Sequence, residues 1–289
     1  MQNYTFKPLD LSAAGLVQLQ QLMAMVWPQA RHLDYSYLHW LYNENPAGAA
    51  LGINAWEGEE LAGHYALLPL NALRFAQPTR GALSLNTAVH PHHQGKGLFL
   101  CLAQQSYDLA ITRGITHVLG VANANSTPGF TRKLGFSLIG PLDVRISFSL
   151  PQLRTTPLGP IPSWQRSWSN HELAWRLANP HGRYSSVAEG ATRWVLASVA
   201  QAGTGSILKI EQRAEGIASI DAAIPRKNPP LCKVWLGLSP QIHPSIFSFP
   251  LPQRLRPSPL NLIYRSLSPG DESPGRASIQ IEGIDFDAF

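Results

Sequence analysis

The stretch Val89–Phe99, VHPHHQGKGLF, decides how this chain folds. Apolar residues alternate along Leu83–Val89, which predicts a strand, and a leucine-bearing helix is predicted from about Gly95 to Arg113. A glycine-rich turn between a strand and a helix presents backbone N–H groups to an anion, and the helix dipole adds positive potential. Gly95 and Gly97 let a phosphate approach the backbone, because neither has a Cβ. The stretch by itself therefore predicts either a binding site for a phosphate-bearing ligand or a purely structural turn.

The turn differs from two common phosphate loops and is similar to a third. It has no closing Gly-Lys-Ser/Thr, as a Walker A loop would, and it lacks the Gly-x-Gly-x-x-Gly spacing of a dinucleotide fold. Residues His92–Gly97 resemble motif A of the GNAT (Gcn5-related N-acetyltransferase) superfamily, Gln/Arg-x-x-Gly-x-Gly/Ala, with His92 at the Gln/Arg position. Downstream, Asn123–Ser126 follows the next predicted strand, and Phe130–Phe136 (FTRKLGF) resembles the family's (Leu/Phe)-Tyr-x-Lys-Leu-Gly-Phe segment. Together with the preceding elements, the resemblance covers residues 1–150.

Helix and strand signals alternate along residues 1–150. Two stretches carry apolar residues at helical spacing, and a polar Glu-Gly-Glu-Glu turn separates two apolar runs as in a hairpin. The predicted helices cover residues 12–27, 34–42, 95–113 and 128–134. The predicted strands cover residues 51–56, 61–70, 72–75, 83–89, 117–122 and 136–149, with a turn at 77–81.

The second half begins after a proline-rich crossing at residues 150–164, which contains four prolines. It predicts a helix at 170–178 and strands at 183–188, 193–199, 206–212, 231–238, 260–266 and 278–284. A weak repeat links the halves, because Trp40 precedes Asn45-Pro46 much as Trp175 precedes Asn179-Pro180. Chance or a duplicated unit would produce it. No Gly-x-Gly in the second half lies on a strand-to-helix turn.

The fold class that follows is α/β (α+β): a GNAT fold with a central mixed sheet, splayed strands and flanking helices, followed by a degenerate GNAT-like unit. We predict a GNAT acyl-CoA-binding domain at residues 1–150 and the degenerate unit at residues 165–289. The whole chain looks like the two-unit GNAT proteins associated with bacterial surface-polysaccharide synthesis. That resemblance implies an acyl-CoA-dependent N-acyltransferase. It would move an acetyl group from acetyl-CoA, or another acyl group from its CoA ester, to a small-molecule amine, possibly a nucleotide-linked amino sugar.

The resemblance also implies where acyl-CoA binds. Strand 83–89 should splay from strand 117–122, with pantetheine in the gap beside Ala88 and Val89. The pyrophosphate should lie on the amides of Gln94–Leu98. The residues expected to bind the cosubstrate are therefore Ala88, Val89, His92, His93, Gln94, Gly95, Lys96, Gly97, Leu98, Asn125, Ser126 and Phe130.

The catalytic groups are less clearly marked. Many GNAT enzymes use a Tyr to protonate the leaving thiolate, but Thr131 holds the matching position, and its hydroxyl is too weak an acid. Tyr65, Tyr35 or solvent could replace it. His64 is a candidate base because its pKa is near neutral, or else a hydrogen-bonded strand histidine. Asn86 could orient a water or a sugar hydroxyl, or face solvent.

The chain ends in an aromatic and acidic tail, Ile284–Phe289. Its carboxylates could attract a cationic amine or serve as a base, or the tail could simply dock on the protein.

Composition also bears on nucleic acid binding, metal binding and membrane association. Charged residues make up only 14% and the net charge is +5, with Lys and Arg scattered rather than clustered, so we expect no nucleic acid partner. Cys101 and Cys232 lie in apolar runs without metal-ligand spacing, so we expect no metal. No apolar run reaches the ~18 residues of a membrane span and no signal peptide is evident, so a cytoplasmic protein is expected. The oligomeric state is not predicted.

Three alternatives remain open from the sequence. One is a GNAT relative that transfers aminoacyl groups from tRNA to peptidoglycan precursors, which needs no Gly-x-Gly loop. Another is a peptide or antibiotic N-acetyltransferase. The last is a non-catalytic acyl-CoA-binding regulator, which the absence of Tyr at Thr131 would permit.

Overall fold

The computed structural model describes residues 3–150, 152–153, 161–189, 192–198, 204–212, 224–240, 242–243, 248–251 and 258–286. The helices are α1 (Ala13–Val26), α2 (Tyr35–Asn43), α3 (Leu98–Thr112), α4 (Thr127–Lys133) and α5 (Asn170–Leu177), with short 3₁₀ turns η1 (Pro91–His93) and η4 (Gly283–Asp285). The strands of the first half are β1 (Thr5–Pro8), β2 (Leu51–Glu57), β3 (Glu60–Arg74), β4 (Gln77–Val89), β5 (His117–Ala122), β6 (Ser137–Pro141) and β7 (Asp143–Ser147). Those of the second half are β8 (Gln152–Leu153), β9 (Trp164–Arg166), β10 (Tyr184–Glu189), β11 (Thr192–Ser198), β12 (Thr204–Gln212), β13 (Cys232–Leu238), β14 (Ile242–His243), β15 (Ser248–Pro250), β16 (Asn261–Ser266) and β17 (Ile279–Glu282).

The predicted helices and most predicted strands are confirmed, with three boundary corrections. β3 runs without a break to Arg74 and turns through Phe75 and Ala76, both with positive φ (47° and 63°), so β4 begins before the predicted turn has ended. Helix α3 begins at Leu98, because Gly95 and Gly97 adopt left-handed conformations that a helix excludes. The single strand expected at 136–149 is two strands, β6 and β7, which pair in different places.

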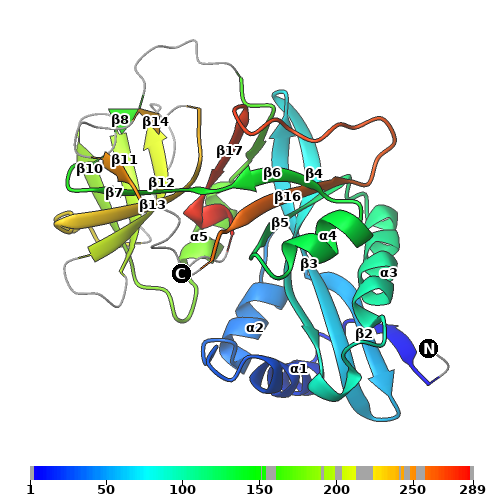
Figure 1. Ribbon diagram of the computed structural model, residues 1–289. Coiled ribbons are helices and arrows are strands. Elements are labelled where there is room, and N and C mark those ends of the chain that lie inside the picture. Colours follow the sequence, from blue (N-terminus) through cyan, green and yellow to red (C-terminus); the bar gives the residue numbers. More distant parts are fainter. Residues whose placement is uncertain are drawn as a thin grey trace.

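The first half is a sheet with helices on both faces (Figure 1). Side chains alternate along β3: Ala66 and Leu68 join the core that contains α1 and α2, whereas Tyr65 and Leu67 join the core that contains α3. Both faces are covered, so β3 is buried throughout its middle. This explains why its sequence is an apolar run without polar alternation.

Strands β4 and β5 separate partway along their length. They pair in parallel only from Gly81 to Ser84 on β4 and from His117 to Gly120 on β5. Beyond this point no pairing of the two strands is present, which confirms the splay expected from the sequence. A gap therefore opens between Leu85–Val89 and the end of β5.

The second half repeats the strand pairing of the first. In the first half β2, β3 and β4 are antiparallel neighbours and β4 is parallel to β5; in the second, β10, β11 and β12 are antiparallel neighbours and β12 is parallel to β13. The halves also exchange a strand each. β16 pairs with β5 and β6 of the first half, and β7 pairs with β13 and β15 of the second.

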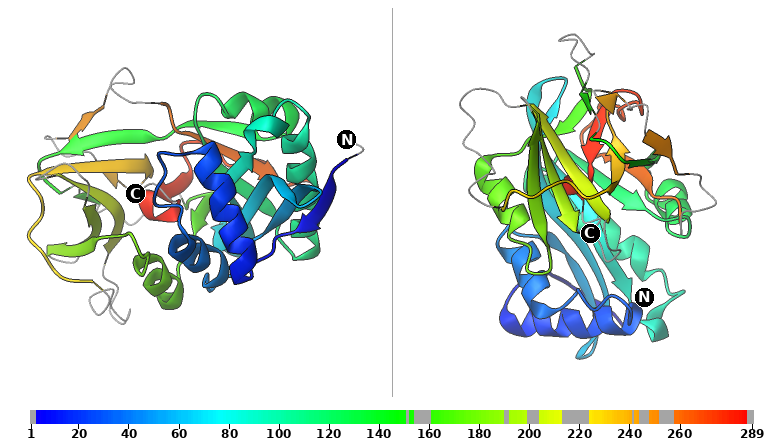
Figure 2. Two further views of the ribbon diagram at one scale, coloured as in Figure 1. Left: turned by 90° about the horizontal axis from the view of Figure 1, so that it is seen from below. Right: turned by 90° about the vertical axis from the view of Figure 1, so that its left-hand side faces the viewer.

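This exchange crosses the predicted boundary between residues 1–150 and 165–289. In Figure 1, β16, from the end of the chain, lies in the sheet of the first half, and β7 reaches across to the second. The main hydrophobic core also draws on both halves, for example on Trp40 and Trp175. The left view of Figure 2, seen from below, shows the two halves side by side. Residues 1–150 and 165–289 are thus two consecutive segments of the sequence, but they share one sheet and one hydrophobic core.

None of the described helices is both long and apolar enough to cross a membrane.

Candidate active site

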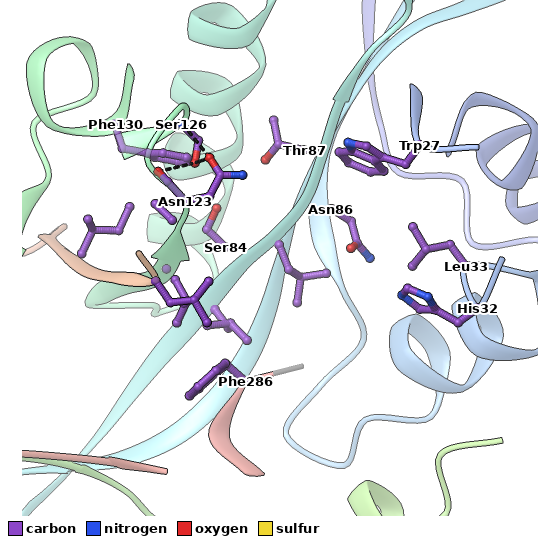
Figure 3. Close-up of a pocket in the computed structure, with 17 residues that line it drawn as sticks. Trp27, His32, Leu33, Ser84, Asn86, Thr87, Asn123, Ser126, Phe130 and Phe286 are labelled. Carbon is purple, nitrogen blue, oxygen red and sulfur yellow. Dashed lines mark hydrogen bonds between the residues drawn. The ribbon is translucent and has the colours of Figure 1, made fainter. Parts of the chain in front are cut away.

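A cleft of about 630 Å³ opens where β4 and β5 separate. Its walls come from both halves of the chain: β4, β5 and α4, the connection between α1 and α2, and the C-terminal segment (Figure 3). The lining residues are Trp27, His32, Leu33, Leu83, Ser84, Leu85, Asn86, Thr87, Gly120, Val121, Ala122, Asn123, Ser126, Phe130, Leu260, Ile263 and Phe286. The cleft is largely apolar, with amides and hydroxyls at a few positions, as is typical of small-molecule sites.

The predicted phosphate loop connects β4 to α3. Gly95 and Gly97 have φ values of 74° and 79°, and a Cβ added at either would meet no atom within 4 Å. In the described part of the chain, the amides of Gly95, Lys96 and Gly97 donate no hydrogen bond. The first turn of α3 has no side-chain cap. The loop therefore presents unpaired N–H groups and a helix N-terminus to open space, which favours an anion there.

The side chains of this loop differ in their availability. Leu98 is buried against the α3 core, so only its backbone can serve a ligand. Gln94 donates from Nε2 to the carbonyl of Val89 over 3.3 Å, which holds the loop to the end of β4. His92 and Lys96 are exposed.

His93 is buried rather than facing a ligand. Its Nδ1 lies 2.9 Å from the Tyr4 hydroxyl and its Nε2 lies 2.9 Å from Oε2 of Glu60. Together with His90, these groups tie the base of the loop to the hairpin between β2 and β3. The sequence suggested that His93 contacts the cosubstrate; the structure instead gives it a supporting position.

Glu60, His90 and His93 have the residue types of a metal site, and their ligand atoms lie within 4.8 Å of one another. The hydrogen bonds, however, favour a hydrogen-bonded cluster without a metal. His90 Nδ1 accepts from the amide of His92, so the neutral ring carries its proton on Nε2, which lies 3.5 Å from Glu60 Oε1. A donor nitrogen has no lone pair to offer a metal. The neighbouring histidines also lower the pKa of Glu60.

A chain of hydrogen bonds runs from the cleft into the core. Asn86 lies at a bulge in β4 with a positive φ of 51°, and its Nδ2 donates to the Tyr42 hydroxyl over 3.1 Å. Tyr42 in turn lies 3.1 Å from His64 Nε2, and His64 Nδ1 lies 2.7 Å from Asn54 Oδ1. Because Asn54 Oδ1 can only accept, His64 donates from Nδ1 and accepts the Tyr42 proton on Nε2. This series of hydrogen bonds thus holds the Asn86 side chain through Nδ2 and leaves its Oδ1 to accept a hydrogen bond from a ligand.

Helix α4 supplies the opposite wall. Asn123 Oδ1 accepts from the amides of Asn125 and Ser126, which closes the turn after β5. Asn123, Ser126 and Phe130 line the cleft. In Figure 3 these three residues lie on the opposite side of β4 from His32. Asn125 is exposed and does not line the cleft, whereas Asn123, two residues earlier, does.

Comparison with known proteins identifies this arrangement. Residues 14–139 match the family described as acetyltransferase (GNAT) domain. The chain contains a GNAT acetyltransferase domain. The GNAT fold, the acyltransferase class and the use of an acyl-CoA cosubstrate, all expected from the motif A resemblance, are confirmed at the level of this family. No curated protein sequence is detectably similar to the chain.

Solved structures extend the likeness beyond the GNAT domain. A GCN5-related N-acetyltransferase from Kribbella flavida has 11% identity and a TM-score of 0.59, over 92% of this chain and 72% of its own. One from Anabaena variabilis has 14% identity and a TM-score of 0.57, over 91% and 73%. N-myristoyltransferase from Saccharomyces cerevisiae, solved with myristoyl-CoA, has 9% identity and a TM-score of 0.56, over 97% and 89%. At these identities the likeness concerns the fold alone.

The structure corrects the role suggested for His64 in this GNAT domain. His64 is fully buried, both ring nitrogens are engaged, and it does not line the cleft. Burial lowers its pKa to about 3. A base must reach the proton that it removes, so His64 supports Asn86 through Tyr42 instead.

Tyr65 is also set back from the cleft. Its hydroxyl lies 2.7 Å from both Ser84 Oγ and Tyr107 Oη, and burial raises its pKa to about 12. Ser84 lines the cleft between Tyr65 and the open space. Thr131 donates to the carbonyl of Thr127 over 3.0 Å and does not line the cleft, so neither residue is positioned to protonate a leaving group there. Of the three predicted catalytic residues, only Asn86 borders the cleft.

Sequence reasoning missed one wall of the cleft. Trp27, His32 and Leu33 come from the connection between α1 and α2, and Phe286 comes from the end of the chain. No motif marks these positions, and only folding brings them to β4. Among the described lining residues, His32 is the only ionisable side chain, and none is a carboxylate. Of the tail carboxylates suggested from the sequence, that of Asp285 is buried, where it accepts from the Trp168 indole N–H over 2.8 Å and from the Glu282 amide over 2.7 Å, and it does not line the cleft. Asp287 and the chain end lie outside the described residues.

Proposed function

We propose that this protein transfers an acyl group from acyl-CoA to a primary amine held between β4 and the connection from α1 to α2. The observation that carries the proposal is the opening of the β4–β5 pairing after Ser84, beside a loop whose amides are unpaired. The gap would hold pantetheine, and the loop amides would hold the pyrophosphate, as motif A implies. Ala88 and Val89 lie at the end of β4 that leads into this loop.

The loop favours acyl-CoA over an aminoacyl-tRNA donor. Unpaired N–H groups at the start of α3 suit a compact pyrophosphate, whereas an aminoacyl-tRNA would place no such group there. We therefore favour acyl-CoA over aminoacyl-tRNA as the donor substrate. The acyl chain would extend along the apolar walls of the cleft, and acetyl is the simplest case.

The acceptor side supports a neutral or anionic molecule that carries one amine. A polycationic antibiotic would need carboxylates, and no described lining residue supplies one. Amide and hydroxyl groups at Asn86 and Thr87 could hydrogen-bond sugar hydroxyls. A nucleotide-linked amino sugar combines hydroxyls, one amine and negative charge, so it remains the substrate class we propose, with the reaction placed in the cytoplasm.

The second half would complete this site without binding its own cosubstrate. Leu260, Ile263 and Phe286 line the cleft of the first half, and the second half has no Gly-x-Gly on a strand-to-helix turn. We propose that residues 165–289 are a degenerate copy of the first unit that lost its phosphate loop. Acyl-CoA should then bind once per chain.

Thiol release from acetyl-CoA, measured across a panel of amines, tests the proposal. The panel should include a nucleotide-linked amino sugar, a free amino sugar, a peptide amine and a polycationic antibiotic. We expect the highest kcat/KM with the nucleotide-linked sugar and little turnover of the antibiotic. Calorimetry with CoA should run beside it, because tight binding without turnover of any amine would favour the acyl-CoA-binding regulator.

A further inference from the structure

His32 is the only ionisable residue among the described residues that line the cleft. It lies in the connection between α1 and α2, next to Leu33, and both line the cleft across from Asn86. Figure 3 shows His32 and Asn86 on the same side of β4, and Asn123 and Ser126 on the other. Since the gap between β4 and β5 is the proposed place for pantetheine, His32 lies on the side left for the acceptor.

The surroundings of His32 come from both halves of the chain. Its ring meets that of Tyr37 edge to face, 5.7 Å between centroids. Beyond Tyr37, His181 of the second half stacks on the Tyr37 ring and lies 3.1 Å from a carboxylate oxygen of Asp34. The His32 ring is exposed on one side, and its partial desolvation, together with the nearby charge of His181, lowers the pKa of His32, whereas Asp34 opposes this shift. The neutral ring, which can accept a proton, is thus favoured at neutral pH.

We propose that His32 is the general base of the acyl transfer, and that His181 tunes it from the second half. The inference rests on the proposed function. Asn86 Oδ1, fixed by the chain through Tyr42 and His64, would accept a hydrogen bond from the acceptor amine and orient it. His32 would then remove the proton that the nitrogen loses as it attacks.

The proton and bond changes balance without another reactant. The amine nitrogen forms a bond to the thioester carbonyl carbon, and His32 Nδ1 or Nε2 takes the proton from that nitrogen. The C–S bond breaks and the electron pair leaves with the CoA thiolate. The imidazolium then returns its proton to the thiolate, directly or through water, which yields the amide and CoA-SH. This route explains why neither Thr131 nor Tyr65 needs to act as an acid.

The test compares His32→Gln with wild type and with His39→Gln, which alters a half-buried histidine of α2 that pairs with Glu44 and lies outside the cleft lining. We expect His32→Gln to lower kcat by roughly a hundredfold, the scale of a lost general base. The Kd for CoA should not change, because the loop is untouched. His39→Gln should retain wild-type kcat.

The pH profile separates catalysis from mere packing. The acidic limb of kcat/KM in wild type should reflect a group with a pKa below that of an ordinary histidine, and it should be absent in His32→Gln. His181→Gln should move this limb to higher pH, because it removes a like charge, and Asp34→Asn should move it to lower pH. A purely structural role would leave the position of the limb unchanged.

The outcomes are distinct. An active wild type whose His32→Gln variant keeps its kcat and its acidic limb would overturn the role of His32 and leave the proposed function intact. A wild type that binds CoA but acylates no amine in the panel would overturn both.

Discussion

The indole N–H of Trp40 donates to the backbone carbonyl of Trp175 over 2.8 Å, and the indole N–H of Trp175 donates to the carbonyl of Trp40 over 3.1 Å. The two rings stack with centroids 5.1 Å apart and an angle of 21°. The two tryptophans thus make equivalent, reciprocal hydrogen bonds, as residues related by a two-fold axis do. The contact joins α2 of the first half to α5 of the second.

The turns that follow these helices match as well. Asn45 Oδ1 accepts from the amide of Ala47, and Asn179 Oδ1 accepts from the amide of His181. The carbonyls of the same two asparagines accept from the amides of Gly48 and Gly182. The Trp and Asn-Pro positions that formed the weak repeat are therefore structurally equivalent. This supports the reading of the chain as a duplicated unit.

We expect the Trp pair to contribute to stability as a unit. Trp40→Phe and Trp175→Phe each remove one buried hydrogen bond, at a cost of about 1 kcal/mol. In the double variant the losses should be non-additive by at least about 0.5 kcal/mol, because the residues are in contact. Urea unfolding of the four proteins measures the coupling. Strictly additive losses would mean that the two residues stabilise the halves independently.

Replacing Gly97 by Val should weaken CoA binding at least tenfold, or about 1.4 kcal/mol. The Cβ branch would occupy the open space from which the pyrophosphate approaches. Gly114→Val is the matched control, since Gly114 has φ 73° against 79° at Gly97 and equally open surroundings at the other end of α3. Both variants should lose similar stability, but only Gly97→Val should lose affinity by calorimetry. Equal affinities in two folded variants would remove the loop from the binding site.

Thr131→Val should retain most of the activity. The hydroxyl is used by the carbonyl of Thr127, and the residue does not line the cleft. An alkyl hydroxyl is also far too weak an acid to protonate a thiolate near neutral pH. Steady-state kinetics on the folded variant tests this. A hundredfold lower kcat would show that the position keeps the role that Tyr has in many relatives.

Stability should fall as the pH drops below about 6.5, the ordinary pKa of histidine. Burial holds the pKa of His64 at about 3 and that of His117 at about 4. Between these values and 6.5 the unfolded chain binds protons that the folded chain does not, so acid favours unfolding. Each histidine should contribute up to about 1.4 kcal/mol per pH unit in this range.

His117→Gln isolates one of these contributions. Gln keeps an acceptor for the Trp164 indole N–H, which His117 Nε2 accepts over 2.9 Å, but it cannot be protonated. Denaturant midpoints measured from pH 8 to pH 5 should vary less in this variant than in wild type. His171→Gln, at an exposed position of α5, should follow the wild-type curve. Parallel curves for all three proteins would rule out His117 as a source of the acid sensitivity.

Cutting the chain after residue 150 should abolish transfer and expose apolar surface. β16 lies between β5 and β6, so the fragment would lose the strand that joins them and one wall of the cleft. Light scattering and a transfer assay on the fragment test this, and titration of the intact chain with CoA should saturate at one equivalent. A soluble, fully active fragment or a stoichiometry of two would contradict the role given to the second half.

Local chemistry accounts for what could be predicted. The Ser12 side chain accepts from Gly15 at the start of α1, and Asp34 does the same for Tyr37 at the start of α2, as their positions before apolar helices indicated. The left-handed glycines of the loop are likewise a property of a short segment. The sequence did not reveal that His64 and Tyr65 are buried. Both faces of β3 are covered, so odd-numbered and even-numbered residues alike are buried.

The sequence by itself determined the left-handed glycine loop between β4 and α3, the order of helices and strands in the first half, and the Trp and Asn-Pro repeat. Each depends on residues close together in the chain, where backbone sterics and hydrophobic spacing act directly. Only the tertiary structure decided that β7 and β16 change places, that His32 and Phe286 meet at one cleft, and that His64 serves Asn86 through Tyr42. These arrangements depend on contacts between distant segments, and a single sequence holds no local signal for which strand completes which sheet.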